Sequence, residues 1–157
     1  NGQEFAEDYW LVENDEGGGR RVQPRPLHWS FSNDKFGTPL RALYKRLIEI
    51  RKNFPGLRSD NVYPVDWSNN QTQFNEEGYG VDRDSGIVIY HRYGNDVARK
   101  LQRFIIVLNF SQDKKTVSVP FPDNGVWEDL LSDWKPSVIS NRLDFEIGSN
   151  WGHIFFR

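Results

Sequence analysis

The stretch that decides the fold is Phe104-Ile105-Ile106-Val107-Leu108-Asn109-Phe110, which is rich in β-branched and aromatic residues. A short apolar run of this kind, bounded by turn residues, is typical of a buried β-strand. Similar runs occupy residues 87–93, 116–121, 126–131, 143–147 and 154–156, and residues 62–67 form a further candidate strand. The C-terminal part of the chain is therefore expected to consist of short strands.

Turn-forming residues separate these runs, and no helical pattern lies between them. The turns are Asp84-Ser85-Gly86, Gly94-Asn95-Asp96, Asp123-Asn124-Gly125 and Ser149-Asn150. Glycine, asparagine and aspartate favour tight turns. Several short strands without intervening helices indicate an antiparallel sandwich. We expect a mainly β fold, an antiparallel β-sandwich of Greek-key type over residues 58–157.

One amphipathic helix precedes the predicted strands. Apolar residues recur at helical spacing: Leu40, Leu43, Tyr44, Leu47, Ile48, Ile50 and Phe54. Thr38 is expected to cap the helix, and Pro55 to end it near Asn53. The apolar face is expected to pack against protein, most plausibly the sandwich. Arg51 falls within the apolar arc, so we expect it to be removed from water and to bind a carboxylate or several carbonyls.

Residues 6–36 predict a long irregular N-terminal loop. An acidic and then glycine-rich segment covers residues 13–19, and Pro24 and Pro26 prevent regular structure nearby. A loop of this length is uncommon in a compact domain unless it serves a site or lacks its partners.

Composition argues against several classes of partner. The 157 residues carry 20 basic and 22 acidic side chains, a net charge of −2, which provides no field for a phosphate backbone. No apolar run approaches the ~20 residues that span a bilayer. The chain has no cysteine, and His28, His91 and His153 have no ligand spacing. We therefore expect no nucleic acid, membrane, metal or cofactor, and interpret the histidines as ordinary surface or core residues.

Several motifs, in this order, resemble the alpha-amylase family of glycoside hydrolases. Asn1-Gly2-Gln3-Glu4-Phe5 is similar to the end of that family's eighth barrel strand, and Arg25-Pro26-Leu27-His28-Trp29 to the loop after it. Residues 43–57 resemble the last barrel helix and its exit. Residues 104–111 and 126–131 resemble two strands of the family's C-terminal β domain.

The resemblance implies that residues 1–57 are the end of a (β/α)8 barrel and that residues 58–157 are the C-terminal β-sandwich domain. On this interpretation the chain is the tail of a larger enzyme, and its partner is the remainder of the barrel. In the family, the two catalytic carboxylates and a third that helps position the substrate lie upstream of this segment, so we expect no catalytic residue here. Arg142-Leu143-Asp144 imitates the family's nucleophile motif, but it falls in the β domain.

The implied role is that of a C-terminal accessory domain of an alpha-amylase-type glycosidase or transglycosylase acting on alpha-glucans. Glu4, Arg25 and Trp29 are the residues that the resemblance places near a substrate. In the alternative interpretation, Glu4 and Arg25 pair and order the loop.

Two other functions remain open from the sequence. A stand-alone carbohydrate-binding module would present tryptophans on one exposed face, whereas large aromatic residues are mostly buried. Trp127 and Trp151 are expected in the core, and Trp134 is expected to be the most exposed. A protein-interaction module would instead show an apolar patch, and the exposed helix face could then form a dimer.

Overall fold

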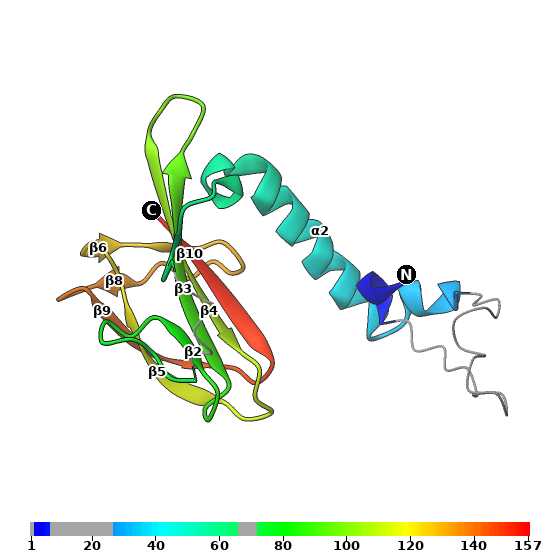
Figure 1. Ribbon diagram of the computed structural model, residues 1–157. Coiled ribbons are helices and arrows are strands. Elements are labelled where there is room, and N and C mark those ends of the chain that lie inside the picture. Colours follow the sequence, from blue (N-terminus) through cyan, green and yellow to red (C-terminus); the bar gives the residue numbers. More distant parts are fainter. Residues whose placement is uncertain (1, 7–26, 66–71) are drawn as a thin grey trace, which may run out of the picture. The chain divides into compact units, whose positions relative to one another are not determined.

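A computed structural model of the protein describes residues 2–6, 27–65 and 72–157 (Figure 1). The chain forms two compact units, Asn1–Glu49 and Ile50–Arg157. The boundary between them falls inside a helix, so the last turn of that helix belongs to the second unit.

Short helices and one long helix make up the described part of the first unit. They are the 3-10 helices η1 (Gln3–Phe5) and η2 (Trp29–Asn33), followed by the α-helix α2 (Gly37–Asn53). Asp34 caps α2, because its Oδ1 accepts the backbone N–H groups of Phe36 at 2.8 Å and Gly37 at 2.6 Å. The prediction that Thr38 caps the helix is therefore wrong.

The capping turn also explains the glycine at the start of α2. A Cβ atom on Gly37 would lie 1.8 Å from the carbonyl oxygen of Phe31, so no larger residue fits there. At its other end the helix stops at Asn53, as predicted, and Pro55 begins the 3-10 helix η3 (Pro55–Arg58).

The apolar face of α2 is largely exposed along its middle turns. Tyr44, Leu47 and Ile48 are all exposed, whereas Ile50, in the second unit, retains 3% of its accessible surface. Packing of the helix face against protein is confirmed for Ile50. For the three exposed side chains it stays a prediction.

The second unit is built on a six-stranded antiparallel sheet. Its strands are β1 (Val62–Tyr63), β2 (Gly80–Asp82), β3 (Ile87–Asn95), β4 (Leu101–Asn109), β7 (Glu128–Asp129) and β10 (Trp151–Phe156). They follow the order β1-β3-β4-β10-β7, and β2 also pairs with β3.

Two antiparallel strand pairs complete the second unit. The pair β5 (Lys115–Pro120) and β9 (Arg142–Ile147) forms one, and β6 (Gly125–Val126) with β8 (Ser137–Val138) forms the other. The fold is mainly β with antiparallel sheets and resembles a small β-sandwich, as predicted.

The prediction of one strand over residues 126–131 is wrong in one respect, because the structure has two short strands there, separated at Trp127. Residues before the break pair with β8, and residues after it pair with β10. The indole of Trp127 is fully buried, and its Nε1 donates to the Asp123 carbonyl at 3.0 Å. The break therefore coincides with the residue whose ring is buried in the core.

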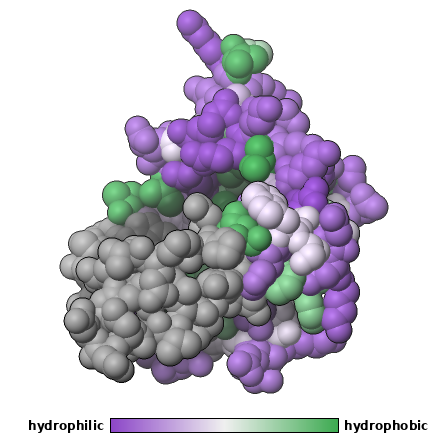
Figure 2. Space-filling model, turned by 90° about the vertical axis from the view of Figure 1, so that its right-hand side faces the viewer, coloured by the Kyte–Doolittle hydropathy of each residue, from purple (hydrophilic) through white to green (hydrophobic). Residues whose placement is uncertain are grey.

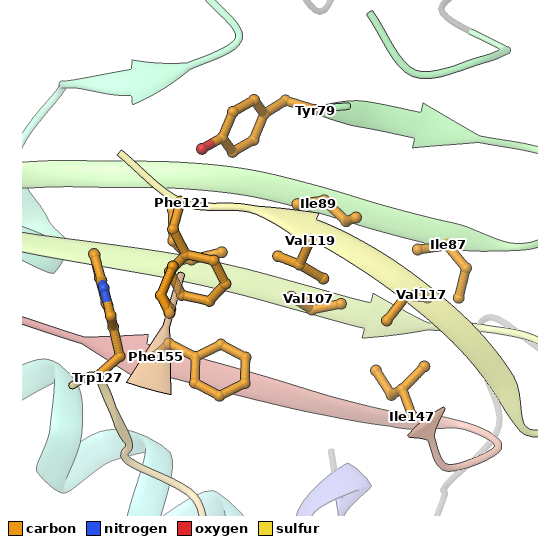
Figure 3. Packing of buried hydrophobic residues seen from close by; sticks show 12 residues of the cluster. Tyr79, Ile87, Ile89, Val107, Val117, Val119, Phe121, Trp127, Ile147 and Phe155 are labelled. Carbon is orange, nitrogen blue, oxygen red and sulfur yellow. The ribbon is translucent and has the colours of Figure 1, made fainter. Parts of the chain in front are cut away.

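The main core lies between the large sheet and the β5–β9 pair (Figure 3). The large sheet contributes Ile87, Ile89, Ile105, Val107 and Phe155, and the facing pair contributes Val117, Val119 and Ile147. Residues along β3 and β4 alternate between the two faces of the sheet, so every second residue enters this core.

A second core covers the opposite face of the large sheet. It comprises Ile50, Leu57, Phe104, Ile106 and Leu130, with Phe54 packed against it. The Phe54 ring lies edge-on to Phe104 at 5.7 Å between ring centroids. Strand β4 is thus buried on both faces, which accounts for its nearly continuous apolar sequence.

The predicted burial of Arg51 is wrong. The side chain is exposed, and its Nη1 donates to one backbone carbonyl, that of Leu57, at 3.3 Å. Ile50 is the buried residue of this turn, and the next position lies about 100° around the helix. The Arg51 guanidinium therefore reaches the surface.

Candidate functional site

The predicted substrate-binding residues lie in the first unit where the structure describes them. Glu4 is exposed in η1, and Trp29, at the start of η2, is 66% exposed. The ring centroid of Trp29 lies 5.5 Å from that of Phe5. The two N-terminal motifs that resemble the alpha-amylase family, residues 1–5 and 25–29, therefore meet at this contact. Arg25 lies outside the described residues, and a role for Glu4, Arg25 and Trp29 in binding stays a prediction.

The second unit contains a cavity of about 440 Å³ that opens widely to solvent. It borders the main core, because the inner faces of β3 and β4 continue past Ile89 and Ile105 to His91 and Arg103, which line the cavity. Tyr63, Tyr79, Phe121 and Arg142 also line it. This volume falls within the range of roughly 300–1,000 Å³ found for small-molecule sites.

His91 is the least expected residue in this cavity. It occupies a core position on β3 and is 7% exposed, yet its Nε2 atom has no hydrogen-bond partner among the described residues. Burial, together with the positive charge of Arg103, lowers the pKa of His91 from 6.5 to about 4, against the opposing effect of Asp123. The imidazole is therefore neutral at pH 7.

Two tyrosines form a further part of the wall. The hydroxyl of Tyr79 donates to the Pro120 carbonyl at 3.1 Å, and burial raises the pKa of Tyr79 well above its usual value. The Tyr63 ring lies edge-on to Tyr79 at 5.3 Å, and its hydroxyl accepts a bond from Asn75 Nδ2 at 3.1 Å. A hydrogen bond with Glu77 is the main cause that raises the pKa of Tyr63.

Charged groups surround the cavity and differ in how firmly they are held. Arg103 Nε forms an ion pair with Asp123 Oδ2 at 3.1 Å. Arg142 makes long contacts, to Ser118 at 3.5 Å and to the carbonyl of Glu77 at 3.4 Å. The Arg142 guanidinium is therefore the group best placed to rearrange around a ligand.

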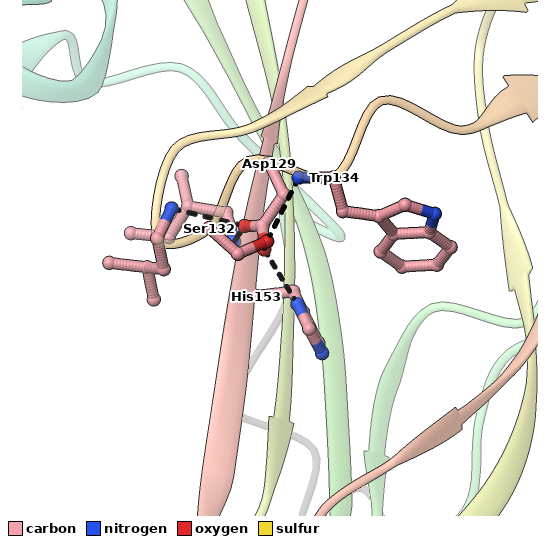
Figure 4. Close-up of polar contacts among 6 residues, drawn as sticks. Asp129, Ser132, Trp134 and His153 are labelled. Atoms are coloured by element: carbon pink, nitrogen blue, oxygen red, sulfur yellow. Dashed lines mark hydrogen bonds and ion pairs between the residues drawn. The ribbon is translucent and has the colours of Figure 1, made fainter.

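A second polar cluster is centred on Asp129 (Figure 4). Asp129 is 1% exposed, and its carboxylate accepts a hydrogen bond from Ser132 Oγ at 2.6 Å and contacts His153 Nδ1 at 2.9 Å. Backbone N–H groups of Leu131 and Ile154 also donate to it at 3.2 Å. Burial raises the pKa of Asp129, but these hydrogen bonds outweigh it and lower the pKa below its usual value.

The Asp129 cluster contains the residue types of a serine hydrolase triad in a different arrangement. In a triad the serine hydroxyl bonds to the histidine, which acts as its base. Here the Ser132 hydroxyl bonds to Asp129 instead, so His153 is not placed to activate it. The cluster stabilises the meeting of β7 and β10 rather than preparing a nucleophile.

The tryptophans divide between core and surface. Trp127 is buried, as predicted, but the prediction for Trp151 is wrong, because it is 44% exposed at the start of β10. Trp134 is 37% exposed, less than Trp151, because its ring contacts Phe145 at 5.2 Å and His153 at 5.8 Å. The prediction that Trp134 is the most exposed is therefore wrong as well. Trp67 lies outside the described residues.

None of the helices in the described part of the chain has the length and apolar character needed to cross a membrane. Nor do these residues contain a cluster of three histidine or acidic side chains that could hold a metal ion. On the face shown in Figure 2, the described residues are mainly hydrophilic, with hydrophobic side chains in separate groups.

No family model and no curated protein matches the chain in sequence. Among solved structures, an alpha-amylase from Anoxybacillus, described as giving insight into a new glycosyl hydrolase subclass, matches with a TM-score of 0.54 and 15% identity. The match covers 79% of this chain but 23% of the amylase. At this identity the likeness shows a shared fold, and the chain spans about a quarter of that enzyme's length.

Proposed function

We propose that the chain is the C-terminal accessory domain of an alpha-amylase-type glycosidase or transglycosylase acting on alpha-glucans. The observation that carries this proposal is the structural likeness to an alpha-amylase over 79% of the chain. The order of the resembling sequence motifs supports it independently. Residues 1–57 would then complete the catalytic barrel, and residues 58–157 would form the β domain that follows it.

The exposed helix face supports a role beside a larger partner. Tyr44, Leu47 and Ile48 are exposed apolar side chains on α2. Covering one such side chain stabilises a protein by about 1.5–3 kcal/mol. The remainder of the barrel is the partner that would cover them.

The carboxylates of this chain are poorly placed for glycosidic chemistry. Glycosidases need an acid and a second carboxylate held on opposite sides of the bond. Asp144, in the imitation of the nucleophile motif, is exposed on β9 opposite Ser118, and Glu4 is exposed in the short helix η1. We therefore propose that the chain does not cleave or transfer alpha-glucosidic bonds by itself.

The test is turnover of starch and maltooligosaccharides by the purified chain, with Asp144→Asn and Glu4→Gln as matched variants. We expect no turnover from a folded sample. Turnover that either substitution abolishes would show that the active site lies in this chain and would overturn the proposal.

The exposed tryptophans favour a second candidate function, a carbohydrate-binding module. Trp134 and Trp151 are 37% and 44% exposed, and flat indole rings stack on sugar faces. If this module is the function, Trp134→Ala and Trp151→Ala should each reduce retention on insoluble starch. Unchanged retention in both variants would exclude these residues as the binding surface.

A further inference from the structure

The hairpin between β3 and β4 extends beyond the rest of the large sheet (Figure 1). Strand β1 pairs with β3 only as far as Arg92, and β10 pairs with β4 only from Phe104 onward. Beyond these points β3 and β4 continue to pair with each other, as far as Asn95 and Leu101. Residues 93–103 therefore form a two-stranded arm that projects past β1 and β10.

A hydrogen-bonded turn fixes the tip of this arm. Asp96 Oδ1 accepts the backbone N–H groups of Ala98 and Lys100, both at 2.8 Å. The N–H of Asp96 donates to the Lys100 carbonyl at 2.9 Å, and the N–H of Arg99 donates to the Asp96 carbonyl at 3.0 Å. This turn presents the side chain of Val97, which is 95% exposed. The tip is preorganised, which lowers the entropic cost of binding a partner.

Basic side chains gather around the arm. Helix η3 and the residue after it pack against its base, where Ser59 Oγ donates to the Tyr93 carbonyl at 2.6 Å. Residues 50–60 and 91–101 together are called the arm surface here. Its basic residues are Arg51, Lys52, Arg58, Arg92, Arg99 and Lys100, and its acidic residues are Asp60 and Asp96.

The basic side chains of the arm surface form no ion pair with another described residue. The ion pairs within the described part of the chain join other side chains. Arg58 donates instead to the carbonyl of Lys52 at 2.9 Å, and Arg92 donates to that of Leu57 at 2.8 Å. All of the basic side chains except the half-buried Arg92 are exposed. They can therefore meet carboxylates of a partner.

The charge of the arm surface is opposite to that of the remaining chain. Of the 20 basic and 22 acidic residues in the chain, six and two lie in the arm surface, which leaves 14 basic and 20 acidic residues elsewhere. The arm surface thus has a net charge of +4, and the remainder has a net charge of −6. This remainder repels a long polyanion such as nucleic acid, whereas a short acidic segment can bind the arm surface alone.

We propose that the arm surface binds an acidic segment of a partner protein, with carboxylates at the basic side chains and an apolar side chain against Val97. Complementary charges of this kind speed association and select the partner. The inference rests on the charge of the surface, its exposed basic side chains and its fixed apolar tip. It does not depend on the proposed function.

The test is the binding of fluorescently labelled probes to the purified chain, measured by fluorescence anisotropy. The main probe is a short peptide of alternating glutamate and leucine residues. An oligoglutamate of the same length and a single-stranded oligonucleotide are the parallel probes. We expect the mixed peptide to bind most tightly and its affinity to fall as salt is added, because salt screens exposed charges.

Two arginines at opposite ends of β3 give a matched comparison. Arg99→Glu, at the tip of the arm, should weaken binding of the mixed peptide by about tenfold or more, because a like charge then faces the peptide carboxylates. Arg83→Glu, in the turn before β3, makes the same change of charge away from the arm and should leave binding unchanged. Both side chains are exposed, so both variants should fold.

A third variant tests the apolar tip. Val97→Ser removes no charge, and the side chain is 95% exposed, so the fold should be retained. It should weaken binding of the mixed peptide and leave binding of the oligoglutamate unchanged. Unchanged binding of both peptides would overturn the proposed contact at Val97.

Three other results would overturn the inference as a whole. Absence of peptide binding would remove the site, and equal weakening by Arg99→Glu and Arg83→Glu would show attraction by overall charge rather than by the arm. Tighter binding of the oligonucleotide than of the mixed peptide would assign the surface to nucleic acid. The test needs neither a glucan nor a catalytic barrel, so failure of this inference is distinguishable from failure of the proposed function.

Discussion

Acidification should destabilise the β unit through His91. The folded state holds the imidazole neutral, with a pKa lowered to about 4, whereas the unfolded chain has the ordinary value of 6.5. Well above pH 6.5 the imidazole is neutral in both states and the stability is complete. As the pH falls below 6.5 the unfolded state takes up a proton first, so the free energy of unfolding decreases until the pH reaches about 4.

The size of this effect follows from the shift in pKa. Each unit of pKa difference corresponds to about 1.4 kcal/mol, so the full loss between pH 6.5 and pH 4 is about 3 kcal/mol. A domain of this size is stable by roughly 5–15 kcal/mol, so the loss is a large fraction of the total. The shift arises mainly from burial, with a smaller contribution from Arg103.

The assay is urea unfolding at several pH values, compared between the natural chain and His91→Phe. The variant has no imidazole to protonate, so the difference between the two curves should change by about 3 kcal/mol across this range. His28→Gln, in the other unit, controls for the loss of a histidine as such. Parallel curves for the natural chain and His91→Phe would refute the reasoning.

Three further predictions concern the core, the buried carboxylate and the helix. In urea unfolding, Trp127→Ala should lower the free energy of unfolding by about 3–5 kcal/mol, whereas Trp151→Ala, at an exposed site, should lower it far less. Equal losses of stability in the two variants would contradict the assigned burial. Asp129→Ala should lower the free energy of unfolding by about 3 kcal/mol, because it leaves several buried donors unpaired. The pKa of Asp129 is lower in the folded chain than its usual value of 3.8, so the stability that the carboxylate contributes should be lost as the pH falls below 3.8. The chain should self-associate in sedimentation through the exposed apolar face of α2, and Ile48→Lys should weaken this self-association. If the natural chain and the variant are both monomers, this face does not self-associate.

The strands were largely predictable because their residues are both β-branched and buried. The apolar run through Phe104 and Ile106 is covered on both faces, so its sequence records burial directly. Strands β2 and β8 were not predicted, since their three and two residues are too few to show a period. The break at Trp127 was missed because an aromatic residue favours a strand locally, while core packing decides its actual position.

The helix cap and the cavity were harder to predict, for different reasons. Asp34 is hard to identify as the cap from sequence because Thr38 and Pro39 also form a plausible helix start. His91 carries no motif, although its period-2 spacing from Ile87 and Ile89 was a signal that it faces the core. In sequence, Arg142 belongs to the imitation of the nucleophile motif, and only the three-dimensional fold brings it to the cavity.

The central claim is that this chain completes an alpha-amylase-type enzyme, and the coding sequence directly before Asn1 tests it most directly. We predict that this sequence encodes the earlier strands of a (β/α)8 barrel, with the two carboxylates that glycosidic cleavage needs and a third that helps position the substrate. Upstream sequence without such strands and carboxylates would contradict the account.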